Sequence, residues 1–232
     1  MHDRPTEPRI EPIDLDDVTD AELRDTLAGA LTHDGKPLNI FGVLGHHPKL
    51  LKRFNLLGGF ILNKGLLPER ERELVILRVG WNAQAVYEFG QHTVIGKRCG
   101  LTDDEIAALT KSPYDHDWSP DDRALIALAD DLHADDCVSA GTWLALTDRW
   151  SEAELVELLI VAGFYRLVSG FLNSAGVQLD DGIPGFPTGG LQQGIAAGVR
   201  PLVQSTVGGV RSGCRTGRAG STGGSRPPAS GR

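Results

Sequence analysis

The sequence predicts an all-α fold, and three observations support this prediction. Helix-start signals recur, because Thr or Ser precedes Glu by three residues at 19–22, 102–105 and 151–154. This spacing is typical of a capping box, in which two side chains satisfy free N–H groups of the first helical turn. Apolar residues then recur at the three-to-four-residue period of amphipathic helices. Period-two alternation, which marks a strand, does not persist, and β-branched residues are few.

The expected helices follow one another between residues 19 and 173, and we expect about seven or eight of them. Their start signals, in chain order, are the Thr19 box, Pro48, Pro68, the run 82–99, the Thr102 box, Ser119-Pro120 and the Ser151 box. Proline suits a first helical turn, because its missing N–H would have no partner there. Gly100 follows Lys97 and Arg98 and is expected to end the run 82–99.

Composition divides the chain into three parts. Residues 1–18 are rich in Pro, Asp and Glu and are interpreted as a flexible leader. Residues 187–232 are dense in Gly, Ser and Arg, with six arginines and no acidic residue. Such a segment buries too little apolar surface to fold, so we expect a disordered tail, solvated rather than bound to RNA or an acidic partner. Residues 19–186 remain as one helical domain.

Charge and composition exclude several classes of protein. The chain carries 31 acidic against 23 basic residues, a formal net charge of −8, which disfavours nucleic acid. No stretch approaches the roughly 20 apolar residues that cross a bilayer, and the N-terminus has no apolar signal region. The cysteines are odd in number and scattered, so neither a disulfide framework nor a zinc site is indicated: Cys99, Cys137, Cys214. We expect a cytoplasmic protein that binds neither nucleic acid nor membrane.

The residues best suited to chemistry lie in the run 82–99. Glu88 and His92 are four residues apart, so a helix places both on one face, and Gln84 lies one turn earlier on the same stripe. A carboxylate beside an imidazole in a partly dry pocket is typical of general acid–base catalysis. The spacing alone also fits a surface contact or a satisfied core pair, and these alternatives stay open.

A third candidate lies one helix earlier. Glu73 follows the charged run 69–72 and precedes the apolar run 74–77, so it stands at the border of a buried stripe. It is either part of a site or a plain surface carboxylate. Neither a zinc-protease motif, nor a glycine-rich phosphate loop, nor a carboxylate cluster with metal spacing occurs in the sequence, so neither a metal nor a cofactor is expected.

The segment LPERERELVILRVGWNAQAVYEFGQHTVIGKRCGLTDDEIAAL resembles the core repeat of the carboxymuconolactone decarboxylase family, which includes the alkylhydroperoxidase AhpD group. The ordered combination RERELVILRVG, YEFGQH and GLTDDEI carries the resemblance, which is strong over residues 45–110. It implies an AhpD-like helical bundle built around a helical hairpin. It also implies a homo-oligomer, trimeric or hexameric, that acts on a small molecule.

The chain departs from the AhpD-like members of that family. They carry a glutamate and then Cys-x-x-Cys-x-x-x-His, and alignment on His92 puts Ala85 and Glu88 at the cysteine positions while keeping Glu73. Thiol-dependent peroxide reduction needs a reactive cysteine and normally a resolving partner. An AhpD-like alkylhydroperoxidase (peroxiredoxin) activity is therefore disfavoured, and Cys99 is interpreted as a small buried hydrophobe.

The decarboxylase branch has no cysteine pair, and its pattern resembles Tyr87-Glu88-x-x-x-His92. The resemblance implies cofactor-independent acid–base chemistry, either decarboxylation or isomerisation, on a small lactone or carboxylic acid. Its catalytic candidates are Glu73, Glu88 and His92, and the substrate-binding candidates are Arg78, Tyr87 and Gln84. Arg78 would hold a substrate carboxylate by a bidentate contact. The remaining alternative is a non-catalytic helical oligomer that binds a metabolite.

Overall fold

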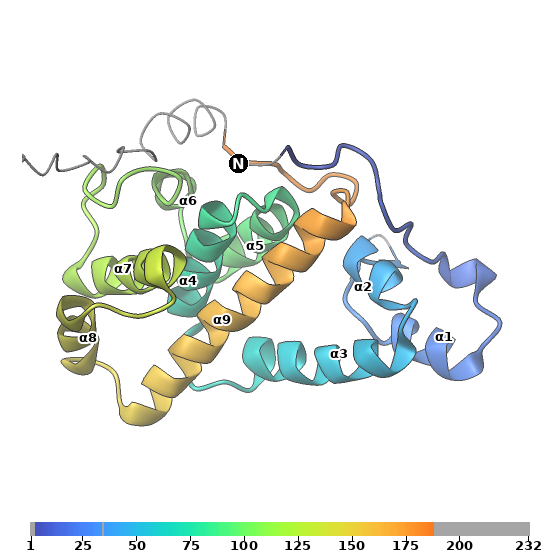
Figure 1. Ribbon diagram of the computed structural model, residues 1–232, viewed down its shortest axis with the longest axis horizontal. Helices are drawn as coiled ribbons and strands as arrows, with labels where there is room; N and C mark the ends of the chain where they lie inside the picture. Colours follow the sequence, from blue (N-terminus) through green and yellow to red (C-terminus); the bar gives the residue numbers. More distant parts are fainter. Residues whose placement is uncertain (1–2, 34, 188–232) are drawn as a thin grey trace, which may run out of the picture. The chain divides into compact units, whose positions relative to one another are not determined.

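The computed structural model describes residues 3–33 and 35–187, and these residues form an all-α fold, as predicted (Figure 1). The helices are, in chain order, η1 (Leu15–Asp17), α1 (Ala21–Ala28), α2 (Asn39–Leu44), α3 (Pro48–Asn63), α4 (Glu69–Asn82), α5 (Val86–Arg98), α6 (Asp103–Ala108), α7 (Pro120–Asp135), α8 (Ala140–Thr147) and α9 (Glu152–Ala175). Two short strands, β1 (Thr32–His33) and β2 (Lys36–Pro37), pair antiparallel, with Thr32 opposite Pro37. The described part thus has nine α-helices, since the short α2 and α8 add to those marked by start signals.

The predicted helix starts are mostly confirmed. The capping boxes at Thr102 and Ser151 form, and Ser119 caps α7 with proline in its first turn. The box predicted at Thr19 is wrong, because the Asp20 side chain is the cap and accepts a hydrogen bond from Leu23 N at 2.7 Å. A carboxylate one residue later satisfies a free N–H group of the first helical turn, and its negative charge also interacts favourably with the positive end of the helix dipole.

Helix α4 is the centre of the larger core. Every residue from Arg72 to Trp81 is buried. The helix packs against α5, α7 and α9, which surround it in Figure 1. A helix that is buried all round has no solvated face, which is why charged residues on α4 need partners inside the fold.

A smaller core joins the N-terminal helices to the ends of α5 and α9. Its buried members come from α1, α2, α3, α5 and α9, and they include Leu27, Phe41, Leu51, Tyr87 and Leu172. Helix α2 lies beside the C-terminal end of α9 (Figure 1), and Phe54 of α3 packs against Phe164 near the middle of α9. The candidate site lies where this smaller core meets the larger one.

Residues 3–18 are ordered along the fold, so the prediction of a flexible leader is wrong for them. The backbone N–H of Arg9 donates to the carbonyl of Ala175 at 2.9 Å, and the Arg4 guanidinium donates to the carbonyl of Ala83 at 2.9 Å. These donors pair with carbonyls that the ends of α9 and α4 leave free. Polar composition suggested a solvated segment, whereas the segment instead caps two helices.

The segment after α9 also packs onto the hairpin of α4 and α5. The Phe186 ring lies edge-on to Trp81 and Phe89, with centroids 5.1 Å from each. A Cβ at Gly90 would lie 2.3 Å from the carbonyl oxygen of Pro184, so only glycine lets this segment approach α5 so closely. The tail predicted to be disordered lies, apart from its first residue, outside the described residues.

Helix α9 is long and apolar enough to cross a membrane by length and composition, although half of its most apolar window is buried inside the fold. The sequence-based expectation that no stretch approaches this length is therefore wrong by this criterion, although an acidic residue, Glu157, lies within the helix. That side chain is buried and accepts hydrogen bonds from the backbone N–H groups of Leu66 and Leu67. The core helix of a folded domain meets the same criterion, so the finding is weak evidence for a membrane.

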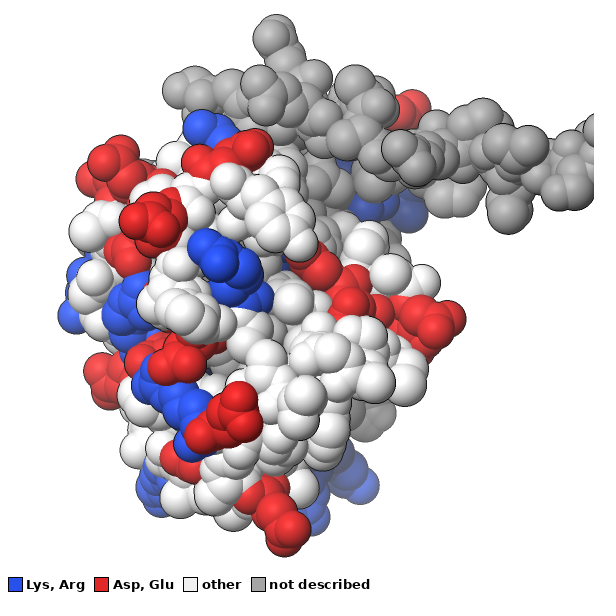
Figure 2. Space-filling model, turned by 90° about the vertical axis from the view of Figure 1, so that its left-hand side faces the viewer, with Lys and Arg blue, Asp and Glu red and all other residues white. Residues whose placement is uncertain are grey.

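The face over α7 and α8 carries charges of both signs. Figure 2 shows acidic and basic side chains interspersed there with uncharged ones. Arg149, for example, donates to Asp121 at 2.6 Å and to Glu71 at 3.0 Å. Because neighbouring charges neutralise one another, this face has no extended patch of one sign that would attract a polyanion.

Candidate active site

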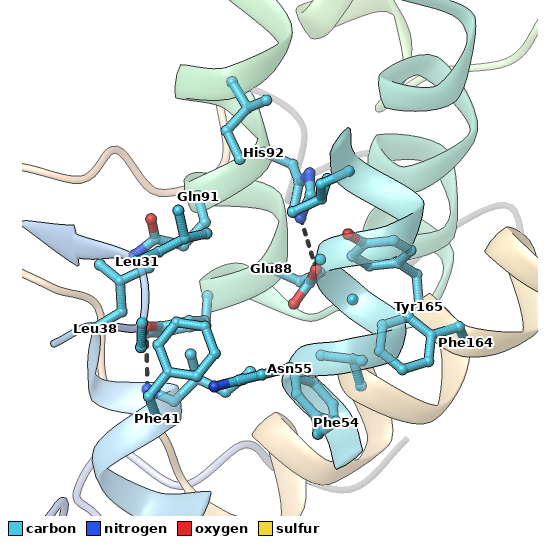
Figure 3. A pocket seen from close by; sticks show the side chains of 18 of the residues that line it. Leu31, Leu38, Phe41, Phe54, Asn55, Glu88, Gln91, His92, Phe164 and Tyr165 are labelled. Atoms are coloured by element: carbon cyan, nitrogen blue, oxygen red, sulfur yellow. Dashed lines mark hydrogen bonds and ion pairs between the residues drawn. The ribbon is translucent and has the colours of Figure 1, made fainter. Parts of the chain in front are cut away.

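A cavity of about 270 Å³ lies between α3, α5, α9 and the segment 29–41 (Figure 3). Its walls are mainly apolar, with aromatic rings from Phe41, Phe54 and Phe164. The polar side chains that line it are Asn55, Asn63, Tyr87, Glu88, Gln91, His92 and Tyr165. A small apolar cavity with a few convergent polar groups is the usual form of a small-molecule site.

The three predicted catalytic residues lie together, with Glu88 and His92 lining the cavity and Glu73 behind His92. His92 Nδ1 lies 2.6 Å from Glu73 Oε2, and His92 Nε2 lies 3.1 Å from Glu88 Oε1. All three are buried, with exposed fractions of 0% for Glu73, 4% for Glu88 and 6% for His92. The prediction that one helix face holds Glu88 and His92 is confirmed, and Glu73 is not a surface carboxylate.

Two helices place these groups. Glu88 and His92 are one turn apart on α5, whereas Glu73 comes from α4, the other arm of the helical hairpin. The second oxygen of Glu73 pairs with Arg72 Nε at 3.1 Å. Two buried acids therefore face two basic groups, which is the arrangement that makes buried charges tolerable.

The surroundings of His92 favour its charged form. Burial alone would lower the pKa of the imidazole, but the charge and hydrogen bond of Glu73, followed by those of Glu88, raise it from 6.5 to about 10. The ring is therefore an imidazolium at neutral pH, donating one N–H to each carboxylate. Glu88 Oε1 accepts from the ring, and the other oxygen, Oε2, makes no hydrogen bond to a described residue.

This charge state has a measurable consequence for stability. The pKa of His92 is higher in the folded protein than in the unfolded chain, so folding stabilises the protonated ring. That contribution is complete below pH 6.5 and is lost as the pH rises to about 10. We expect the free energy of unfolding of the wild type to fall across this window by a few kcal/mol, since one pKa unit corresponds to about 1.4 kcal/mol.

Urea denaturation at several pH values measures this fall. The His92→Gln variant is expected to lose most of the pH dependence, because its amide does not titrate. A wild type and a variant with parallel pH profiles would contradict the assigned charge state.

Tyr165 completes the environment of His92. The two rings pack edge-to-face with centroids 4.8 Å apart (Figure 3). Burial first, and then the charges of Glu88 and Glu73, raise the pKa of the Tyr165 hydroxyl well above its ordinary value. The hydroxyl therefore stays neutral and can donate but not act as a base.

Tyr87 lines the cavity with its ring, while its hydroxyl is used within the fold. The hydroxyl donates to Asp180 Oδ2 at 2.6 Å and accepts from Ile40 N at 3.3 Å. Burial and the neighbouring Asp180 carboxylate raise the pKa of Tyr87. Gln91 Nε2 donates to the same Asp180 oxygen at 2.7 Å, and Asn39 N donates to Asp180 Oδ1 at 3.0 Å. One carboxylate thus ties α2 and α5 together beside the cavity.

The structure contradicts the prediction that Arg78 holds a substrate carboxylate. The side chain lies outside the cavity lining and pairs with both oxygens of Asp130, at 2.6 and 2.8 Å. Its remaining nitrogen donates to the carbonyls of Leu109 and Lys111. Arg78 therefore joins α4 to α7 and to the loop after α6, and four of its five N–H groups are used within the fold.

The prediction for Gln84 is also wrong. The residue lies in the turn between α4 and α5, with a φ of +50° that ends the helical path. Its side-chain nitrogen donates to the carbonyl of Trp81 at 2.7 Å. It is therefore not on the stripe of Glu88 and His92, and it does not line the cavity.

No described cysteine lines the cavity. Cys99 follows α5, is partly exposed rather than buried as expected, and lies 3.8 Å from Glu69 Oε2. Burial and the charges of Glu73 and Glu69 raise the pKa of its thiol. Among the described residues, no group of three or more His, Cys, Asp or Glu side chains could hold a metal ion.

Asn55 was missed by the sequence reasoning. It lies on α3, four residues after the fully buried Leu51, so helical spacing puts a polar amide on the apolar side of that helix. A polar residue on the apolar side of a helix is the sequence feature that could have indicated a role for Asn55.

Comparison with known proteins agrees with this fold. Residues 48–131 match the model of the carboxymuconolactone decarboxylase family. A peroxidase-related protein with an alkylhydroperoxidase AhpD core from Ralstonia eutropha is 19% identical, with a TM-score of 0.66 over 78% of this chain and 95% of that chain. A putative antioxidant defence protein AhpD from Agrobacterium tumefaciens is 17% identical, with a TM-score of 0.55 over 59% and 94%.

A third solved structure is a debrominase in complex with 2,3,4-tribromopyrrole. It is 16% identical, with a TM-score of 0.63 over 77% of this chain and 95% of that chain. No curated protein matches the sequence. At these identities the structural matches establish the AhpD-like helical fold alone.

Proposed function

We propose that this chain, whose residues 48–131 match the model of the carboxymuconolactone decarboxylase family, is a cofactor-independent enzyme that transfers protons on a small neutral carbonyl compound such as a lactone. One observation carries the proposal. A buried carboxylate, Glu88, faces an apolar cavity and is held by an imidazolium that a second carboxylate supports.

The proposed base is Glu88. Its Oε1 accepts from His92, which leaves Oε2 to take a proton from carbon in the substrate. The imidazolium fixes the carboxylate and balances its charge, and Glu73 fixes the imidazolium from the other side. Groups held in this way need little reorganisation during reaction, which is the main source of catalysis by polar sites.

The lining of the cavity favours a neutral substrate. Its described residues include no Lys or Arg. An anion would have to enter an apolar space beside the Glu88 carboxylate, where the positive His92 ring is already paired with two carboxylates, and this is costly. Isomerisation of a lactone is therefore better supported than decarboxylation of a free carboxylic acid.

Two alternatives are less well supported. Several structural neighbours are described as peroxidase-related. A thiol mechanism would use Cys99, which lies outside the cavity lining and whose thiol pKa is raised, so little of the nucleophilic thiolate forms. A protein that only binds a metabolite would share the cavity but would move no proton.

The decisive experiment follows deuterium exchange at the carbon next to the carbonyl. Small lactones and cyclic ketones are incubated with the protein in deuterated water, and proton NMR measures the exchange rate. We expect exchange above the buffer rate for the wild type and equally for Cys99→Ser. If the wild type binds these compounds without exchanging a proton, the enzyme proposal is wrong and the protein only binds a metabolite. If the wild type consumes peroxide and Cys99→Ser does not, the thiol mechanism is supported instead.

We also propose that the protein is a homo-oligomer. Large apolar side chains are exposed along α9 and α3: Val156, Ile160, Leu167, Leu56 and Phe60. On α9 they recur at intervals of four and seven residues, so they form one outer stripe. Extended apolar surface of this kind is characteristic of contacts between proteins.

The Ile160→Glu variant tests the oligomer. The charge is expected to lower the mass of the assembly to that of the monomer, as measured by light scattering after size-exclusion chromatography. Tyr114→Glu, at an exposed position in the loop between α6 and α7, is the matched control and should leave the mass unchanged. A monomeric wild type, or an assembly that survives Ile160→Glu, would contradict the proposal.

A further inference from the structure

The amide of Asn55 has no partner among the described residues. Its Oδ1 atom is buried without a hydrogen bond. In Figure 3 the amide nitrogen extends into the cavity from α3, across from Glu88 on α5. We infer, resting on the proposed function, that Asn55 binds the carbonyl oxygen of the substrate and stabilises the negative charge that forms there.

The surroundings of Asn55 make an unpaired amide costly. Phe54, Phe41 and Phe164 line the same part of the cavity. Buried polar groups are almost always hydrogen-bonded, because leaving one unpaired forfeits its hydration without replacement. A ligand carbonyl at this position supplies an acceptor for the Asn55 N–H groups, whereas the buried Oδ1 calls for a hydrogen-bond donor on the ligand.

The other donors at the cavity are mostly committed elsewhere. The Tyr87 hydroxyl and Gln91 Nε2 both donate to Asp180. Both ring nitrogens of His92 face carboxylates. Among the described lining residues, Asn55 and Tyr165 are left as side-chain donors with no acceptor, and they lie on opposite sides of Glu88 in Figure 3.

The chemistry follows from this placement. Glu88 Oε2 takes a proton from the carbon next to the carbonyl, and the electrons of the broken C–H bond form a carbon–carbon double bond. The carbonyl π electrons move to oxygen, where the Asn55 N–H donates to the resulting enolate. Glu88 then returns the proton to the same carbon or to a conjugated one, so no oxidant or reductant is consumed. Asn55 contributes most in the transition state, because its hydrogen bond strengthens as the charge develops.

A matched pair of probes tests the binding contact without requiring turnover. Cyclohexanone and methylenecyclohexane have nearly the same shape, but only the ketone accepts a hydrogen bond. NMR titration measures their dissociation constants for the wild type and for Asn55→Leu. We expect the variant to bind the ketone about tenfold more weakly relative to the hydrocarbon, which corresponds to about one hydrogen bond.

Asn173→Leu is the matched control. It makes the same substitution on α9, outside the cavity lining, where the amide already donates to the carbonyl of Ala83 at 2.9 Å. The ratio of the two dissociation constants should not change there. The role of Asn55 is contradicted if Asn55→Leu weakens binding of both probes equally, or if the ketone does not bind the wild type. It is also contradicted if the preference for the ketone over the hydrocarbon is lost only in Tyr165→Phe.

Deuterium exchange separates this inference from the proposed function. If the proposed function fails, the wild type binds cyclohexanone with the expected preference but exchanges no proton. If both hold, Asn55→Leu also lowers the exchange rate at saturating ketone. A normal exchange rate at saturation in Asn55→Leu would remove the charge-stabilising role.

Discussion

Glu88→Gln lowers the exchange rate of the bound carbonyl compound by about 100- to 10,000-fold, the usual contribution of a positioned general base. Glutamine has nearly the same shape, and its Oε1 still accepts from His92, so the hairpin keeps its packing. What the variant lacks is the ionised oxygen that receives the proton. Deuterium exchange measured by proton NMR gives the rate, and circular dichroism reports the helical content.

The control for this variant is Glu69→Gln, the same change at an exposed position in the first turn of α4. It should exchange at the wild-type rate. Binding of cyclohexanone to Glu88→Gln should persist, because an apolar cavity and the Asn55 amide remain. If Glu88→Gln exchanges deuterium at the wild-type rate, Glu88 is not the base, even though it contacts His92.

Glu73→Ala has the largest expected effect on stability. Its carboxylate is fully buried and contacts both Arg72 and His92, so its removal leaves two buried positive groups without their main partner. Breaking a buried ion pair from one side costs about 3–5 kcal/mol. We expect the free energy of unfolding, measured by urea denaturation at neutral pH, to fall by this amount.

Glu69→Ala provides the comparison, because its carboxylate is exposed at the start of the same helix. Its cost should stay below about 1 kcal/mol, the size of an exposed helix-dipole contact. Equal losses for the two variants would mean that the buried network contributes no more to stability than a surface charge. Glu73→Gln should fall between them, since an amide still accepts one hydrogen bond.

The sequence predicted best what depends on neighbours along one helix. The four-residue spacing of Glu88 and His92 sets their contact, and the boxes at Thr102 and Ser151 set two helix starts. The contact of Glu73 with His92 spans nineteen residues and depends on how α4 packs against α5. It was therefore anticipated from family resemblance rather than from spacing.

The failures have a common physical cause. The helical pattern runs through Gln84 in the sequence, but a left-handed turn there separates α4 from α5 and removes it from the stripe. Arg78 is satisfied by Asp130, fifty-two residues away on α7, which no local pattern reveals. The segment 29–41 forms part of the cavity wall for the same reason, since its place depends on tertiary contacts with α5.

Asp180 bears on how the protein is made. This carboxylate joins the start of α2 to Tyr87 and Gln91 on α5, yet it lies after the last described helix. During synthesis, α1 to α8 emerge before it, and N-terminal elements generally begin to fold first. The cavity wall is therefore held in place only when nearly all of the helical domain has left the ribosome, so a nascent chain carries the α4–α5 hairpin before the cavity beside it is complete.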